Sequence, residues 1–196
     1  ATDRSALIRY LLHGQAQVAS GILPPNHWAY EPNVAQYALD AARAEKLLDE
    51  AGFPRKQNGV RFHLLLKTST EEQARLIGAA LQEQWRKVGI DLELRPLELA
   101  TLLSDAARGN FQLTYARWVG ANNDPDIFEF VASAKRFPPD GANRGHYRNS
   151  RVDALTDQIH VESNQEKRKL LCSEVQQILA EDLPYIPLWF TDVVSI

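Results

Sequence analysis

The chain has 196 residues and a formal net charge of −3, with 44% hydrophobic and 24% charged residues. These proportions are typical of a globular protein with a real core, and the interspersed charges exclude the basic surface of a nucleic-acid-binding protein. No apolar run reaches the roughly 18 residues that cross a bilayer. A single cysteine, Cys172, excludes an internal disulfide and a cysteine-rich metal site. Because the chain lacks methionine and both ends look structured, we expect it to be an excised piece of a longer protein.

The N-terminal part predicts one helix and a long loop. A helix over residues 3–13 has Thr2 at its N-cap position and Gly14 as its left-handed stop. Its apolar face consists of Leu7, Ile8, Leu11 and Leu12. Three prolines within residues 21–33 forbid regular structure there and predict an ordered crossing loop.

A strand lies between two helices in the next part of the chain. A helix is predicted over 40–51, with Asp40 as its cap and Ala44, Leu47 and Leu48 as its apolar stripe. A buried strand is predicted over 60–68. Ser69 and Glu72 then have the spacing of a capping box, which predicts a helix to about Val88.

The rest of the chain continues this alternation. Asp124 and Pro125 have the pattern of an N-cap followed by the first residue of a helix, and Ser163 and Glu166 form a second capping-box pattern. The other predicted elements are strands over 90–97, 111–119 and 185–190 and helices over 99–108, 151–161 and 163–179. Alternating strands and helices indicate a largely parallel sheet flanked by helices. We therefore expect residues 1–196 to form a single α/β domain.

Ligands of open α/β sheets bind beyond the carboxyl ends of the strands. The first such end is Lys67-Thr68-Ser69, where a strand meets a helix N-terminus and exposed amides and hydroxyls suit a carboxylate or a carbonyl. We expect these three residues to contact a ligand.

The second such end is the segment RWVGANNDPDIF, residues 117–128. Small residues allow a ligand to approach the backbone, asparagine amides can hydrogen-bond it, and a tryptophan provides a flat apolar wall. The candidate ligand-binding residues are Trp118, Gly120, Ala121, Asn122, Asn123 and Asp124. A plain capping turn before a helix is the alternative interpretation of the same residues.

Enzyme signatures are absent from the sequence. There is no nucleophile elbow, zinc-protease motif, Walker loop or dinucleotide fingerprint, and the five histidines lack metal-ligand spacing. We therefore expect no catalysis, no cofactor and no metal. Cys172 is interpreted as a small packing residue. Two hypotheses of other classes stay open: a hydrolase that uses Asp124 and Asp126 as an acid/base pair, and a protein-interaction domain anchored by Trp118, Trp189 and Phe190.

Six segments, in the same order along the chain, resemble the periplasmic solute-binding proteins of ABC importers, in the dipeptide/oligopeptide/nickel-binding family. The segments are DRSALIRYLLHGQAQVASGILPP, YALDAARAEKLLDEAGFP, LIGAALQEQWRKVGIDLEL, RWVGANNDPDIF, HYRNSRVDALTDQI and EKRKLLCSEVQQILAEDLPYIPLWF. The resemblance implies the C-terminal lobe of a type II periplasmic-binding-protein-like fold. It also implies a preceding N-terminal lobe, a membrane permease as partner and a periplasmic or extracytoplasmic location, with a lipid anchor possible in the preceding part.

The resemblance further implies capture of a peptide or peptide-like solute, but two positions depart from the pattern. Peptide-binding relatives carry an acid for the peptide α-amino group where this chain has Ala121, and dipeptide binders carry a basic residue where it has Thr68. An unpaired buried ammonium costs several kcal/mol, so these differences point away from zwitterionic dipeptides. A metal chelate, a sugar or another small molecule is the alternative solute.

Overall fold

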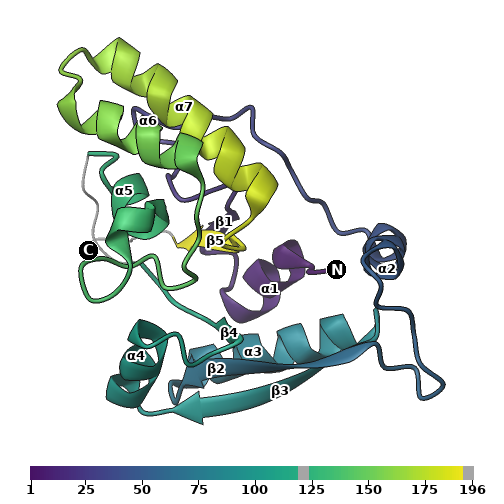
Figure 1. Cartoon of the computed structure of the whole chain (residues 1–196). Helices are drawn as coiled ribbons and strands as arrows, with labels where there is room; N and C mark the ends of the chain where they lie inside the picture. The colour runs from purple at the N-terminus through teal and green to yellow at the C-terminus, as the bar shows by residue number, and fades with distance from the viewer. Residues whose placement is uncertain (119–123, 192–196) are drawn as a thin grey trace. The chain divides into compact units, whose positions relative to one another are not determined.

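The computed structural model describes residues 1–118 and 124–191, which divide into two compact units (Figure 1). The sheet unit comprises residues 1–16, 37–106 and 110–117, and the helical unit comprises residues 17–36, 107–109 and 118–196. The expectation that both units act as one domain stays a prediction.

A parallel three-stranded sheet, ordered β3-β2-β4, is the centre of the sheet unit. The strands are β2 (Phe62–Ser69), β3 (Ile90–Leu97) and β4 (Leu113–Thr114). The connecting helices are α3 (Glu72–Arg86) and α4 (Leu99–Ala107). The parallel pairing confirms the α/β class. The third strand is much shorter than the predicted 111–119, because only Leu113 and Thr114 find partners, on β2.

Helix α3 packs closely against the sheet along a face of small and aliphatic residues. Ile77 and Leu81 are buried there with Ala74, and Leu92 of β3 is 1% exposed. Gly78 allows the close approach, because a Cβ atom at this position would lie 3.3 Å from Leu94 Cδ2. The buried apolar area of this interface supplies the main stabilisation of the sheet unit.

The two N-terminal helices of the sheet unit follow the predicted ranges, with one different cap. In α1 (Arg4–Leu11) the cap is Asp3, whose Oδ1 accepts a hydrogen bond from Ala6 N at 2.9 Å. The predicted cap, Thr2, instead accepts a hydrogen bond from the Trp85 indole at 2.9 Å. Helix α2 (Ala41–Glu50) is capped by Asp40, as predicted.

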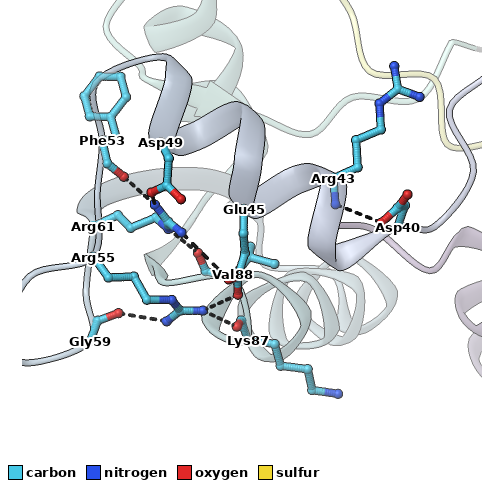
Figure 2. A network of polar contacts seen from close by, with 10 residues as sticks. All are labelled: Asp40, Arg43, Glu45, Asp49, Phe53, Arg55, Gly59, Arg61, Lys87 and Val88. Atoms are coloured by element: carbon cyan, nitrogen blue, oxygen red, sulfur yellow. Dashed lines mark hydrogen bonds and ion pairs between the residues drawn. The ribbon is translucent and has the colours of Figure 1, made fainter.

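Polar contacts to two arginines, rather than apolar burial, hold helix α2 (Figure 2). None of its residues is buried, and the apolar stripe lies partly in solvent, since Leu47 is 53% exposed. The Arg61 side chain, 1% exposed, donates to Asp49 Oδ1 of the helix and to Val88 O at 2.9 Å. Arg55 donates to Glu45 Oε1 at 2.6 Å. The amphipathic pattern therefore predicted the helix correctly, but not what it contacts.

Two long helices and a short strand pair form the framework of the helical unit. The elements are β1 (Ala16–Val18), α5 (Ile127–Ala132), the 3₁₀ turn η1 (Ala134–Arg136), α6 (Ser150–Val161), α7 (Gln165–Asp182) and β5 (Trp189–Thr191). Strand β1, which the sequence did not predict, pairs with β5. Helices α6 and α7 pack together (Figure 1) over a core that contains Phe128, Leu155 and Val175, each fully buried. Residues 21–33 form an irregular segment that packs on this core through Leu23 and Ala29, as expected for a crossing loop.

Three further predicted helix starts, besides that of α1, are wrong in detail. Helix α3 begins after Glu71 without a side-chain cap, so Ser69 forms no capping box. Helix α7 is capped by Asn164, whose Oδ1 accepts from Lys167 N at 3.0 Å, and not by Ser163. Helix α5 begins at Ile127, so Asp124 does not cap it. In the first case Ser69 is still the last residue of β2, and in the third the chain makes a turn at residues 125–126 before the helix starts.

Candidate functional site

The first predicted ligand contact, Lys67-Thr68-Ser69, lies at the end of β2, and its Lys67 already binds other groups of the protein. Lys67 is 5% exposed, and its Nζ forms an ion pair with Asp105 Oδ2 at 2.7 Å and donates to Asn110 O. Thr68 is fully buried, and only Ser69 is half-buried. Lys67 thus ties the segments around α4 and β4 to the sheet. The assignment of Lys67, Thr68 and Ser69 to a solute stays a prediction.

The second predicted ligand contact is the segment 117–128, and the structure describes its first and last residues. Gly120, Ala121, Asn122 and Asn123 lie outside the described residues. Trp118, which precedes them, is 46% exposed. Its ring meets Phe130 of α5 edge-on, with ring centroids 6.3 Å apart, and Arg144 Cζ lies 5.7 Å from its centroid. We call Trp118, Phe130 and Arg144 the Trp118 cluster. It presents aromatic surface and a cation together.

Asp124, which follows the same loop, is held by an arginine from α7. The Arg168 guanidinium contacts both Asp124 oxygens, at 2.8 and 3.2 Å, and reaches Asp126 Oδ1 at 3.6 Å. Arg168 also donates to Ile159 O at 3.1 Å and lies over the Trp28 ring. Asp124, Asp126 and Arg168 form the Asp124 cluster, which fixes the C-terminal end of the loop to the helical unit.

The two carboxylates of the Asp124 cluster have opposite pKa shifts. The hydrogen bonds from Arg168 lower the pKa of Asp124, whereas burial and the neighbouring Asp124 raise the pKa of Asp126. Divergent carboxylates are found in acid/base catalysis. Here, however, Asp124 is engaged by Arg168 and also accepts a hydrogen bond from Asp126 N at 3.2 Å, which defines an Asx turn. The cluster therefore has a structural role.

Sequence reasoning missed Arg144, Phe130 and Arg168. Arg168 is 44 positions from Asp124, so no local pattern relates them. Arg144 belongs to the turn-forming stretch GANRGHY, which had no assigned role. The only feature of the sequence that could have indicated Arg144 is a basic residue among turn-forming residues. These three residues became visible only when the fold brought their segments together.

Two other features of the helical unit are not candidate sites. Burial raises the pKa of the Cys172 thiol to about 12, which makes it inert as a nucleophile and supports its interpretation as a packing residue. A cavity of about 30 Å³, lined in part by Phe128, Leu179 and Tyr185, has room for only one or two water molecules. Within residues 1–118 and 124–191, no three His, Cys, Asp or Glu side chains gather as a metal site would require, and none of the helices is long and apolar enough to cross a membrane.

Comparison with known proteins identifies the family. Residues 1–134 match the family described as "Bacterial extracellular solute-binding proteins, family 5 Middle". The chain belongs to this family. It is 30% identical over 189 residues to a probable di/tripeptide-binding protein 5 of Pseudomonas aeruginosa and 27% identical over 193 residues to heme-binding protein A of Haemophilus influenzae. Each match covers 96% of this chain. The chain spans about a third of the length of these relatives, 35% and 34%.

Solved structures confirm the type II periplasmic-binding-protein fold. The periplasmic binding protein DppA of Helicobacter pylori, in complex with the peptide STSA, superposes with a TM-score of 0.86 and 25% identity, covering 96% of this chain and 36% of that one. NikZ of Campylobacter jejuni, in complex with Ni(L-His), superposes with a TM-score of 0.88 and 24% identity, covering 97% of this chain and 40% of that one. The second likeness concerns the fold alone.

Proposed function

We propose that this chain is the C-terminal lobe of a binding protein that captures a peptide or peptide-like solute for an ABC importer, without catalysis. The observation that carries this proposal is the half-exposed Trp118, set beside Arg144 immediately before the loop of the candidate site, in a chain of the family 5 solute-binding proteins. The solute would lie between this lobe and an N-terminal lobe of the same protein. The complete protein would act outside the cytoplasm with a membrane permease.

The alternative solute is a metal chelate or another small molecule on the same fold. Ala121, where an acid would neutralise a peptide α-amino group, favours this alternative over a zwitterionic dipeptide. The relatives support the same range, since they include a heme-binding protein and di/tripeptide-binding proteins. Peptide capture stays the main proposal, because the α-amino group of a longer peptide would lie away from Ala121.

The test uses the full-length protein encoded by the natural gene. Isothermal titration with di-, tri- and pentapeptides, Ni(L-His) and heme should give saturable binding of at least one compound, and small-angle scattering should show compaction with it. We expect Trp118→Ala to weaken that binding more than tenfold, because an aromatic wall is lost. Tyr10→Ala, which removes a 68% exposed aromatic residue of the sheet unit, is the matched control and should leave binding unchanged. Absence of binding across the panel would contradict solute capture.

A further inference from the structure

We propose that Arg144 is a recognition site for a carboxylate of the solute, with Trp118 as its stacking partner. This inference rests on the proposed function and specifies the chemistry of the solute. Arg144 Cζ lies 5.7 Å from the centroid of Trp118, whose side chain is 46% exposed. A guanidinium over an aromatic face keeps its in-plane N–H donors available for an anion.

In the part of the chain that the structure describes, three arginines of the helical unit are paired with acids, whereas Arg144 and Arg148 are not. Arg136 pairs with Glu129 at 2.6 Å, Arg151 with Glu174 at 2.6 Å, and Arg168 with Asp124 at 2.8 Å. No Asp or Glu among the described residues of the helical unit lies within ion-pair distance of Arg144, although this residue is half-buried. A partly desolvated cation without a counter-charge attracts an anionic ligand group more strongly than an exposed one does.

The backbone that carries Arg144 is held firmly. The neighbouring Asn143 is fully buried, donates to Ser133 O at 3.0 Å and to Tyr147 O at 2.8 Å, and accepts from Tyr147 N at 2.9 Å. One residue earlier, Tyr185 Oη donates to Ala142 O at 3.1 Å. Because the backbone is already fixed here, binding orders only the side chain itself, which favours a recognition role.

The charges around the candidate loop favour an anion over a cation. Residues 119–123 contain no charged side chain. Asp124, the nearest acid in the sequence, is already neutralised by Arg168. Arg144 is thus the unneutralised charge of the Trp118 cluster. A solute carboxylate meets a complementary partner in the Trp118 cluster, which contains no acid for a free ammonium group. We infer that the solute needs a carboxylate and does not need a free amine.

The experiment measures binding of matched peptides to the full-length protein by isothermal titration. The probes are Ala-Ala-Phe, its C-terminal amide, its N-acetyl derivative and the amide of Ala-Asp-Phe, which moves the carboxylate to a side chain. We expect the free acid to bind at least tenfold more tightly than the amide and acetylation to change affinity less than threefold. Recovery of affinity with the Ala-Asp-Phe amide would identify a side-chain carboxylate as an equivalent source, and its absence would restrict the site to the C-terminus.

Two arginine variants isolate the site. Arg144→Gln should abolish the preference for acid over amide, and Arg144→Lys should retain part of it. Arg148→Gln is the matched control, because Arg148 also lies over an aromatic ring, Phe137 at 4.5 Å, but is exposed. It should leave the preference unchanged, and thermal melts should show all three variants folded. Equal binding of acid and amide by the wild type, or an unchanged preference in Arg144→Gln, overturns the carboxylate site while solute capture stands. If the wild type binds none of these peptides, the carboxylate site and peptide capture are both overturned.

Discussion

Two arginines of one polar network provide a test of how burial sets the strength of a hydrogen bond (Figure 2). Arg61 donates to Val88 O at 2.9 Å, to Phe53 O at 2.7 Å and to Asp49, and its side chain is 1% exposed. Arg55 makes as many hydrogen bonds, to Gly59 O at 3.0 Å, Lys87 O at 2.6 Å and Glu45, but its side chain is 36% exposed. The two residues therefore match in bonding and differ in solvent access.

We expect Arg61→Ala to destabilise the sheet unit by about 3 kcal/mol. The buried carbonyl of Val88 loses its side-chain donor, at about 1–2 kcal/mol, and the carbonyl of the half-exposed Phe53 loses about 1 kcal/mol. The buried aliphatic stem adds about 1 kcal/mol. Asp49 contributes little, because it is 53% exposed and water solvates it after the change. Arg55→Ala should cost less than about 1 kcal/mol, because water can replace every contact it makes.

Hydrogen exchange of the amides in β2 and β3 gives the opening free energy of the sheet unit alone. A loss of about 3 kcal/mol accelerates exchange through global opening by about a hundredfold, since each 1.4 kcal/mol is a factor of ten. Arg55→Ala should accelerate it less than about fivefold. Equal acceleration by the two variants would refute the reasoning, because burial would then not decide the strength of these bonds.

The Asp124 cluster and Cys172 give two further predictions. Because Arg168 lowers the pKa of Asp124, this carboxylate stabilises the fold above its unfolded pKa of about 3.9 and loses that effect as the pH falls through the lowered folded pKa. Urea unfolding at pH 7 should show a loss of up to about 1 kcal/mol in Asp124→Asn. Asp126→Asn should show no loss, because the raised pKa of Asp126 signals an unfavourable charge. The difference in stability between the two variants should close near pH 2, and equal losses at pH 7 would contradict the prediction. The Cys172 thiol, with its pKa raised to about 12 by burial, should react with iodoacetamide at pH 8 at least a hundredfold more slowly in the native chain than in urea, and comparable rates would show that it is accessible.

Elements with strong local periodicity were predicted accurately. The strand expected over 90–97 spans Ile90–Leu97, and the helix expected over 151–161 spans Ser150–Val161. Caps were less accurate, because neighbouring polar side chains compete for the same amides: Asp3 and Asn164 cap where Thr2 and Ser163 were expected. In both cases the observed cap lies one residue further along the chain. Local sequence thus fixes the helix, while small geometric differences select the capping residue.

Strand length depended on distant partners and could not be predicted locally. The run over 111–119 is as apolar as β2, yet only Leu113 and Thr114 pair, opposite Leu66 and Lys67. A strand exists only where a neighbour offers a complementary edge, and that neighbour lies more than 40 residues earlier in the chain. For the same reason β1 and β5, which pair across most of the chain length, were missed or misplaced.

Asp124 shows most clearly why the candidate site required the fold. Its sequence context, Asp before Pro, is the pattern of a helix cap, and the nearby Asp126 suggested a catalytic pair. The decisive contact is with Arg168, which comes from a helix that begins 41 positions later, at Gln165. Once Arg168 neutralises Asp124, that acid no longer competes for a ligand, and Arg144 is left without a counter-charge in the Trp118 cluster. The chemistry of the candidate solute therefore depends on which carboxylates the fold has already paired, and pairing at this distance is a property of the packed chain rather than of any segment in it.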